Sequence, residues 1–401
     1  MVGFKKLTAL LAAALPLSTA SPTPFEAKGT STVAVEGKYI VSLKNHVAPR
    51  DAASHLEWVR GVHEQSLGRR DLNLAGVEKT FGVGSYNGYS GHFDAATIEK
   101  IKNNPDVDAI EPVQVYQLYS PVTQDSSTYG LATLSHRNKG ASSYIYDESA
   151  GEGTYAYIVD SGINAEHEDF EDRAVKGYNA IGGAFEDNLG HGTHVAGTIG
   201  GKTYGVAKKA TLVSVKVFEG RTADNSIIMD GYQWAVKDIV DKGIQKRAVV
   251  NMSLGGPKSD AFNRLVEAAY QSGVLSVVAA GNERQDTANV SPASAPNAIT
   301  VGGIDVDWVE YTNSNYGKFV DIMAPAVKVE SAYIGSDSAT AQLTGTSMAS
   351  PHVAGLAIYL AALENLNTPK AVTDRILALG TRGKATLRSN NPNIIAYNGN
   401  A

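Results

Sequence analysis

The chain has 401 residues, of which 43% are hydrophobic and 19% charged, and its formal net charge at pH 7 is −6. This composition is typical of a globular protein long enough for two or three folded units, and a large unit can bury its core without covalent cross-links. The mild charge and the lack of a long basic stretch argue against nucleic acid as a partner. Cysteine is absent, which excludes thiol catalysis, disulfides and cysteine-ligated zinc.

The N-terminus has the pattern of a secretory signal peptide. Two lysines precede an apolar stretch at 7–17, and small residues at Ser18 and Ala20 suit cleavage after Ala20. The apolar stretch is shorter than the roughly 20 residues that a membrane span needs. We therefore expect residues 1–20 to be removed and the protein to be secreted to the extracellular space. No other segment is long and apolar enough that we expect it to cross a membrane.

Residues 21–119 predict a small α+β unit. Its strand-like and helical patterns follow the order strand, helix, hairpin, helix, strand, which is that of a ferredoxin-like fold. The hairpin turn is predicted at 86–89, because Asn87-Gly88 suits left-handed dihedral angles. The predicted strands are 38–43 and 107–110, and the predicted helices are 52–66 and 95–103.

Residues 120–401 predict a larger domain that begins with a polar, turn-rich stretch at 120–128. Short β-branched runs then alternate with helical patterns, and strands that are apolar on both faces indicate a parallel sheet covered by helices. We predict an open, doubly wound α/β domain with its site at the carboxyl ends of the strands. The predicted strands are 155–159, 212–218, 249–253, 274–280 and 320–323, and the predicted helices are 191–199, 226–241, 261–271 and 348–363.

Three segments of this domain carry residues of catalytic type. Asp160 ends an apolar strand, although Asp-Ser-Gly is also ordinary turn chemistry. His191 opens a helix of small residues that can approach another backbone closely, and His194, three residues on, would allow a metal site instead. Ser347 lies at the start of a buried helix. There it either caps the helix or meets the unpaired N–H groups that suit a developing negative charge.

Together the three segments supply a serine nucleophile, a histidine base and an orienting acid, which are the groups that an activated serine needs. Their chain order is Asp160, His191, Ser347, and Ser347 is not in a G-x-S-x-G motif, so an α/β-hydrolase esterase is disfavoured. Asn282 follows a further apolar strand. It either closes a turn or donates, with the Ser347 N–H, to an oxyanion.

These four segments resemble those of the subtilisin superfamily over most of residues 128–400, closest to its proteinase K-like branch and to secreted subtilisins of dermatophyte fungi. The resemblance implies a serine endopeptidase of the peptidase S8 family that digests host or environmental protein, with a role in virulence. The first unit is similar to the family's inhibitory propeptide. This implies a self-processing zymogen whose propeptide ends between 117 and 127, with the apolar stretch 115–119 lying in the cleft like a product.

The resemblance also implies where substrate binds. Ser253, Leu254, Gly255 and Gly256 would line one side of the primary pocket, and Ala279, Ala280 and Gly281 would line the other. These small residues would leave an open slot for large apolar or aromatic P1 side chains. The substrate would pair as an added strand. The family's Gly-Ser-Gly edge strand is replaced here by residues 220–223, so the resemblance implies no preference at S2–S4.

No cofactor is expected to take part in the chemistry. The resemblance implies a structural calcium ion held by the carbonyl oxygens of Pro296 and Ala298 and the carboxylate of Asp321, since oxygen ligands suit calcium, although Asp321 would serve equally as a solvated loop residue. Two N-glycosylation sequons occur. Asn251 lies on an apolar strand and is expected to be buried, so Asn289, in a polar loop, is the better candidate. The protein is expected to be a monomer.

Two other functions remain open on the sequence. A metal-dependent hydrolase would use Asp160, His191 and His194. A catalytically inactive binding protein would keep the fold without hydrolysis, but all four catalytic positions hold competent residues, which favours the serine enzyme. His194 and His352 are expected to be structural.

Overall fold

The computed structural model of the chain describes residues 34–67, 74–114 and 121–399. The predicted signal peptide at 1–20 and the predicted inhibitory stretch at 115–119 lie outside these residues. The N-terminal unit and the larger C-terminal domain are each described by themselves.

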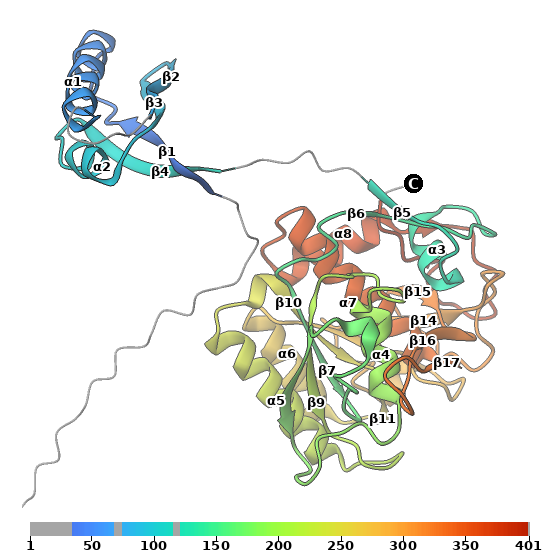
Figure 1. Ribbon diagram of the computed structural model, residues 1–401. Helices are drawn as coiled ribbons and strands as arrows, with labels where there is room; N and C mark the ends of the chain where they lie inside the picture. Colours follow the sequence, from blue (N-terminus) through green and yellow to red (C-terminus); the bar gives the residue numbers. More distant parts are fainter. Residues whose placement is uncertain (1–33, 68–73, 115–120, 400–401) are drawn as a thin grey trace, which may run out of the picture. The chain divides into compact units, whose positions relative to one another are not determined.

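The N-terminal unit is a four-stranded antiparallel sheet in the order β2-β3-β1-β4, with two helices (Figure 1). This confirms the predicted ferredoxin-like order. Val41, Tyr89 and Ile101 are fully buried and belong to the apolar core of the unit. The elements are β1 (Ala34–Leu43), α1 (Pro49–Leu67), β2 (Gly76–Val83), β3 (Tyr86–His92), α2 (Ala95–Lys102) and β4 (Val107–Gln114).

The hairpin of this unit turns three residues earlier than predicted. Gly84 and Ser85 form the turn, whereas Asn87 and Gly88 lie within β3 and pair with Gly82 and Phe81 of β2. Gly84 has φ +60°, and a glycine at the first central position suits a two-residue hairpin as well as Asn-Gly does. The prediction of a turn at 86–89 was therefore wrong in position.

The C-terminal domain is built on a nine-stranded sheet in the order β18-β19-β15-β14-β12-β10-β7-β9-β8. All neighbouring pairs are parallel except β18 and β19 at one edge. The sheet strands are β7 (Tyr155–Asp160), β8 (Ala174–Asn179), β9 (Thr211–Lys216), β10 (Ala248–Met252), β12 (Leu275–Ala279), β14 (Ile299–Ile304), β15 (Ile322–Pro325), β18 (Thr381–Arg382) and β19 (Ile394–Ile395).

Helices cover both faces of this sheet, as Figure 1 shows. Along β7, Ile158 packs in the same apolar cluster as α4 and α7, while Tyr157 and Val159 pack in the cluster that contains α5 and α6. Because both faces of the strands are buried, their residues are apolar at successive positions. This confirms the prediction of a doubly wound α/β domain. The helices are α3 (Tyr129–Ser135), α4 (His191–Gly200), α5 (Asn225–Asp241), α6 (Asp260–Gln271), α7 (Thr346–Leu363) and α8 (Pro369–Leu379).

The prediction from the sequence missed several elements and misplaced others. The stretch 120–128 was predicted as turns, but it contains a strand, β5, that pairs antiparallel with β6. The strands β8 and β14 and the helices α3 and α8 were not predicted, and β15 begins two residues later than expected. The remaining elements are β5 (Pro121–Gln124), β6 (Tyr144–Asp147), η1 (Glu168–Phe170), η2 (Gln245–Arg247), β11 (Gly256–Pro257), η3 (Thr287–Asn289), β13 (Val290–Ser291), β16 (Val329–Ala332) and β17 (Thr340–Leu343).

Helix α7 is the hydrophobic centre of the domain. Among the described residues it alone is long and apolar enough to cross a membrane, which corrects the expectation that no segment beyond the signal has that character. Of the 18 residues of this helix, 83% are buried inside the fold. Gly355 lets it approach α4, because a Cβ there would lie 2.9 Å from the carbonyl oxygen of Ile199. The apolar length of α7 is therefore explained by its burial in the core of this domain.

The strand order places the site. Strand β7 lies between β9 and β10, and the chain continues to β8 and β9 on one side before it crosses to β10 on the other. At such a reversal the connections leave in opposite directions and open a crevice at the carboxyl ends of the strands. Asp160 is the last residue of β7, Ser253 follows β10, and Asn282 follows β12 beyond Ala280 and Gly281, so all three stand at this edge.

Candidate active site

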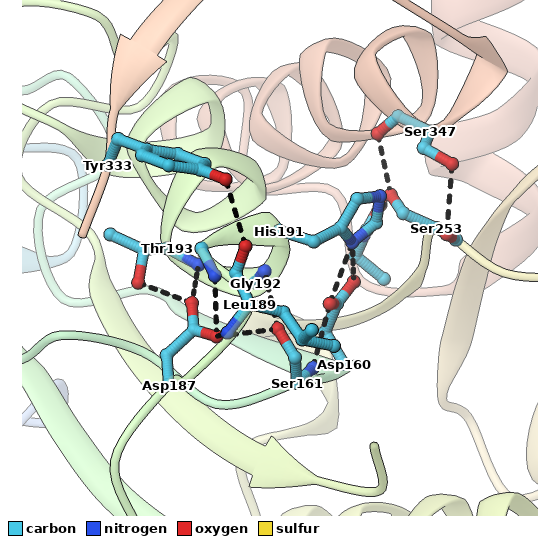
Figure 2. A network of polar contacts seen from close by, with 12 residues as sticks. Asp160, Ser161, Asp187, Leu189, His191, Gly192, Thr193, Ser253, Tyr333 and Ser347 are labelled. Carbon is cyan, nitrogen blue, oxygen red and sulfur yellow. Dashed lines mark hydrogen bonds and ion pairs between the residues drawn. The ribbon is translucent and has the colours of Figure 1, made fainter. Parts of the chain in front are cut away.

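A buried carboxylate and an imidazole meet at the end of β7. Asp160 is 2% exposed, and its two carboxylate oxygens lie 2.8 Å and 2.9 Å from Nδ1 of His191 (Figure 2). His191 is the first residue of α4. The helix comes this close because residue 192 is glycine, since a Cβ there would lie 2.1 Å from the carbonyl oxygen of Gly162.

The carboxylate sets both the tautomer and the basicity of His191. With Nδ1–H donated to Asp160, the neutral ring presents Nε2 as an acceptor, an assignment that follows from the hydrogen-bond network. Burial by itself disfavours the charged ring, but the negative charges of Asp160 and, more weakly, Asp187 outweigh it and raise the pKa of His191 above its usual value. The ring keeps 34% of its side-chain surface exposed, which leaves it reachable from solvent.

Ser347 lies in the first turn of α7, as the sequence predicted, and is half-buried. Its hydroxyl donates to the carbonyl oxygen of Ser253 at 3.0 Å, while the Ser253 hydroxyl donates to the carbonyl oxygen of Ser347 at 2.8 Å (Figure 2). Among the hydrogen bonds that the structure describes, none joins Ser347 to His191. In enzymes without bound substrate such bonds are often long and tighten only in the complex.

A buried chain of hydrogen bonds holds Ser253 against α7. Asn251, on β10, donates to the Ser253 hydroxyl at 3.0 Å and accepts from the Ser350 hydroxyl at 2.7 Å. Asn251 and Ser350 are fully buried and Ser253 is 4% exposed. The side chain of Asn251 therefore supports the first turn of α7. The other sequon asparagine, Asn289, is exposed.

Asn282 is exposed and its orientation is fixed by the residue that precedes Ser347. Its Oδ1 accepts from the backbone N–H of Thr346 at 2.8 Å and from the Thr346 hydroxyl at 3.1 Å. The Thr346 hydroxyl also accepts from the N–H of Gly281 at 3.0 Å. Since the oxygen is occupied, the Nδ2 donor of Asn282 faces the other way and is available to a ligand.

A second asparagine, absent from the sequence prediction, holds the loop that carries Asn282. Asn315 is fully buried, donates to the carbonyl oxygen of Ala280 at 2.9 Å, and accepts from the N–H groups of Glu283 and Gln285. It comes from a distant part of the chain, so no local motif marks it.

The two segments predicted to line the primary pocket flank the start of α7. Gly281 is bonded to Thr346 and Ser253 to Ser347, so both segments are brought to the same place. Their exposure differs. Gly255 and Gly256 are exposed, and Leu254 is half-buried. Ser253, Ala279, Ala280 and Gly281 are buried.

The structure does not bring His194 to the Asp160–His191 pair as a metal ligand. His194 is fully buried and its Nε2 lies 2.9 Å from the carbonyl oxygen of Val329 and 3.1 Å from that of Ala341. Burial lowers its pKa to about 4, so the ring is neutral and donates to these carbonyls. Within the described ranges, no group of three histidine, aspartate or glutamate side chains has the geometry to hold a metal ion.

His352 is likewise enclosed, in the second turn of α7. It is 1% exposed, its Nδ1 contacts the carbonyl oxygen of Met348 at 2.8 Å, and burial lowers its pKa to about 4.

Asp321 lies just before β15 and is half-buried. One of its carboxylate oxygens accepts from the N–H of Thr300 at 2.8 Å, and burial raises its pKa to about 6. Among the loop hydrogen bonds that the structure describes, none is accepted by the carbonyl oxygens of Pro296 or Ala298. Carboxylate and carbonyl oxygens are the ligands that a hard cation such as calcium prefers.

Asp187 is the other residue that the sequence prediction missed. It is 6% exposed and accepts hydrogen bonds from the loop and the first turn of α4 that carry His191. An aspartate three residues before Gly190, directly ahead of a helix, is a signal for a capping carboxylate that could have drawn attention to it.

The fold and these contacts define a class of protein: an α/β enzyme with an acid–imidazole pair and a serine hydroxyl at the carboxyl edge of a parallel sheet. The subtilase family matches residues 151–389, and the peptidase inhibitor I9 family matches residues 38–119. The chain therefore belongs to the subtilase family. It is a subtilisin-like serine protease that carries an I9 propeptide, and its substrates are proteins.

Two similar proteins match the chain over its full length, and a solved structure matches about two thirds of it. Alkaline protease 1 of Aspergillus clavatus is 51% identical over 405 residues and covers 100% of both chains. Subtilisin-like proteinase Mp1 of Magnaporthiopsis poae is 50% identical over 408 residues, covering 100% of this chain and 99% of its own. The crystal structure of a cold adapted subtilisin-like serine proteinase is 36% identical, covers 68% of this chain and 99% of its own, and has a TM-score of 0.63.

Proposed function

We propose that this protein is a secreted endopeptidase that hydrolyses peptide bonds through an acyl-enzyme formed on Ser347, with His191 as base and Asp160 as the orienting acid. The observation that carries this proposal is the pairing of His191 Nδ1 with both oxygens of the buried Asp160, at the edge of the sheet where α7 begins with Ser347. A serine needs such a partnered base to act near neutral pH.

The mechanism follows from these positions. On substrate binding the Ser347 hydroxyl exchanges the Ser253 carbonyl for His191 Nε2 and attacks the scissile carbonyl, while the imidazole takes its proton. Asp160 stabilises the resulting imidazolium, which agrees with the raised pKa of His191. The imidazolium then protonates the leaving amine. Water resolves the acyl-enzyme by the same steps in reverse.

Asn282 Nδ2 and the backbone N–H of Ser347 would hold the oxyanion of the tetrahedral intermediate. The amide oxygen of Asn282 is committed to Thr346, so the donor is preorganised and needs no reorientation during the reaction. Donors fixed in this way stabilise charge that develops only in the transition state.

Specificity is proposed to be broad, with apolar or aromatic side chains preferred at P1. The support is the composition of the segments beside Ser347: Ser253, Gly255 and Gly256 on one side and Ala279, Ala280 and Gly281 on the other. None of these carries a charge that could select a charged P1 residue.

The enzyme is proposed to be a self-processing zymogen that is exported by the signal at 1–20 and matures by cleavage between 117 and 127. The I9 match over 38–119 supports an inhibitory propeptide. Digestion of host or environmental protein and a role in virulence remain implications of the resemblance to secreted fungal subtilisins. Asn289, which is exposed, is the proposed glycosylation site.

A structural calcium ion is proposed at Asp321 with the carbonyl oxygens of Pro296 and Ala298. The half-buried carboxylate accepts one hydrogen bond, from the N–H of Thr300, and burial raises its pKa, so a cation there would stabilise its charged form without taking part in the chemistry. The ion should raise the melting temperature of the Ser347→Ala protein, and Asp321→Asn should abolish the increase.

A fluorophosphonate probe tests the central proposal. The matured protein should be labelled at Ser347, and labelling should abolish hydrolysis of a peptide with phenylalanine at P1. Ser336→Ala, at an exposed serine, is the matched control and should label normally. Hydrolysis that needs a metal and proceeds without labelling would favour the metallohydrolase. Absence of hydrolysis after propeptide removal would favour a binding protein.

A further inference from the structure

The loop that precedes His191 is organised around one buried carboxylate, that of Asp187. Its Oδ1 accepts from the N–H of Leu189 at 3.0 Å, the N–H of Gly190 at 2.9 Å and the hydroxyl of Ser161 at 2.8 Å. Its Oδ2 accepts from the N–H of Thr193 at 2.9 Å and from the Thr193 hydroxyl at 2.6 Å. Figure 2 shows these contacts converging on Asp187.

These contacts supply the cap that α4 lacks in its own sequence. The residue at the N-cap is Gly190, which has no side chain to accept from the first turn. The N–H of Gly192 is satisfied by the Ser161 hydroxyl at 3.0 Å, and that of Thr193 by Asp187. A negative charge at this end of a helix is also favoured by the helix dipole.

The same carboxylate joins α4 to β7. Ser161 donates its hydroxyl to Asp187 and accepts from Gly192, and its own N–H donates to Asp160 at 2.7 Å. His191 lies between these anchor points, since it follows Gly190 and precedes Gly192. The position of the imidazole against Asp160 therefore depends on bonds that Asp187 makes on both sides of it.

The loop is held from outside as well. The Lys216 ammonium, fully buried at the end of β9, donates to the carbonyl oxygen of Glu186, and the Tyr333 hydroxyl donates to the carbonyl oxygen of Leu189 at 2.9 Å. Gly190 has φ +77°, and a Cβ there would lie 2.4 Å from the Tyr333 ring. The backbone around Asp187 thus has little freedom to adjust.

We propose that Asp187 is a positioning residue of this protease: its carboxylate fixes the start of α4 to the end of β7 and holds His191 in the orientation that the reaction needs. The inference rests on the proposed catalytic role of His191. Only a carboxylate can accept from all five donors, because an amide would place an N–H₂ group against one set of them.

Asp187 also contributes charge. Asp160 from β7 and Asp187 from the loop place negative charge near His191, and His194 lies in the next turn of α4. Lys216 and Tyr333 hold the loop, and the Lys216 ammonium is paired with the Glu219 carboxylate at 2.8 Å. Asp160 and Asp187 both favour the imidazolium. Replacing Asp187 with a neutral group should therefore lower the pKa of His191.

The variant Asp187→Asn tests whether Asp187 positions His191 or only stabilises the folded protein. The turnover number kcat should fall on the order of tenfold to a hundredfold, because small misplacements of a catalytic group are costly. The KM should stay within about twofold, since Asp187 is not proposed to contact substrate. The acid limb of the kcat/KM profile should move to lower pH, because a less basic His191 stays neutral there. Rates are normalised to the sites that a fluorophosphonate titrates.

Asp169→Asn is the matched control at the other end of the same helix. Asp169 is also 6% exposed, and its carboxylate accepts from the N–H of Thr203 at 2.8 Å near the end of α4. This variant should lower stability and leave the acid limb in place. An unchanged profile and kcat in a folded Asp187→Asn enzyme, or equal shifts of the acid limb in the two variants, would overturn the inference.

Two milder variants keep the test open if Asp187→Asn does not fold or mature. Thr193→Val and Ser161→Ala each remove one donor to Asp187 and leave its charge, so each should lower kcat without moving the acid limb. Thr193→Ser keeps the hydroxyl and should restore kcat. Wild-type kcat in both Thr193→Val and Ser161→Ala contradicts the positioning role. If the wild-type enzyme itself were not labelled by fluorophosphonate, the proposed function would fail instead.

Discussion

Asn282, the proposed oxyanion donor, illustrates how neighbouring residues orient a side chain. Its side chain is exposed, and nothing in the residue itself separates it from other loop asparagines. The contacts of its Oδ1 with Thr346 and the support of its loop by Asn315 leave its N–H₂ group as a fixed donor beside Ser347. A fixed donor has more effect on a transition state than a mobile one, because its orientation costs nothing at the moment of reaction.

Asn282→Ala should therefore lower kcat by on the order of 10² to 10³, the loss that subtilisin itself shows when its oxyanion amide is removed. The KM should change little, because the bond forms only as charge develops. Steady-state hydrolysis of a peptide with phenylalanine at P1 measures both constants. Asn313→Ala, at an exposed amide whose contact with Tyr311 is 3.5 Å long, should retain wild-type kcat. A kcat within twofold of wild type for Asn282→Ala would refute the oxyanion role.

Local sequence patterns predicted the site residues that lie at the ends of strands and helices. They did not predict the residues that hold the site through contacts with distant segments. Asp160 at a strand end, His191 at a helix start and Ser347 in the first turn of α7 were all placed correctly, because each lies at a boundary that local patterns mark. Asp187 and Asn315 were missed. Four of the five donors to Asp187 come from residues 189–193, so its capping position was marked locally, but the bond from Ser161 was not. The side chain of Asn315 bonds to residues 280–285, and that pairing follows from tertiary structure alone.

At the scale of elements, α7 encloses an ionisable group that must stay neutral. His352 is 1% exposed and its pKa is lowered to about 4 by burial, from an ordinary value of 6.5. Between these two values the unfolded chain binds more protons than the folded one. The contribution of His352 to stability is therefore present above pH 6.5 and is lost as the pH falls toward 4.

His352→Gln should flatten this dependence. In the Ser347→Ala background, which prevents autolysis, the free energy of unfolding should fall between pH 6.5 and 4 by about 1 to 3 kcal/mol less than in the parent. Urea denaturation at a series of pH values measures the slope. The same slope in parent and variant would show that folding does not lower the pKa of His352.

The loop between α4 and β9 contains a buried lysine, Lys208, whose effect on stability depends on pH in the alkaline range. Lys208 is 7% exposed, and its ammonium donates to the carbonyl oxygens of Lys202 at 3.0 Å and Thr203 at 3.2 Å. Burial lowers its pKa to about 7 from 10.5, although the charge of Asp169 opposes the shift. The unfolded chain therefore binds more protons between these values, and stability from this group rises as the pH increases from 7 toward 10.5.

Lys208→Met should remove that rise, because no proton is then released on folding. Unfolding of the Ser347→Ala protein by urea at pH 7 to 10 measures the slope, which should be smaller in the variant than in the parent. The matched control is Lys209→Met, since the adjacent Lys209 side chain is 46% exposed, and its slope should equal that of the parent. Equal slopes in Lys208→Met and the parent would mean that the buried ammonium is not destabilised.

Elements were predictable where burial imposes a single pattern. The central strands and the helices α4 to α7 were found within a few residues of their bounds, because both faces of the sheet are covered. The hairpin was misplaced because Gly84-Ser85 and Asn87-Gly88 satisfy the same local requirement, and pairing of Gly82 with Asn87 decides between them. Strand β5 was missed because its stability comes from pairing with β6.

At the scale of the molecule, the order of the strands explains how distant segments form one site. The chain leaves β7 toward β8 and β9 and later returns to its other side at β10, so the loops after β7, β10 and β12 share one edge with the start of α7. The fold class was predictable, since alternating strands and helices permit few arrangements. The contacts across the edge were not, because they depend on the exact register of these elements.

Cleavage of the propeptide by the protease itself would require all of these segments to form one working site, so maturation tests the proposed site as a whole. If the propeptide is released by the protease's own cleavage between 117 and 127, then Ser347→Ala should accumulate the unprocessed precursor, because no acyl-enzyme can form without the hydroxyl. Ser336→Ala, at an exposed serine, should mature normally. Added active enzyme should cleave the Ser347→Ala precursor near the same position, which would show that the accumulated protein is folded and cleavable. Full maturation of purified Ser347→Ala with no active enzyme present would mean that another nucleophile or protease performs the step, and the self-processing model would have to be abandoned.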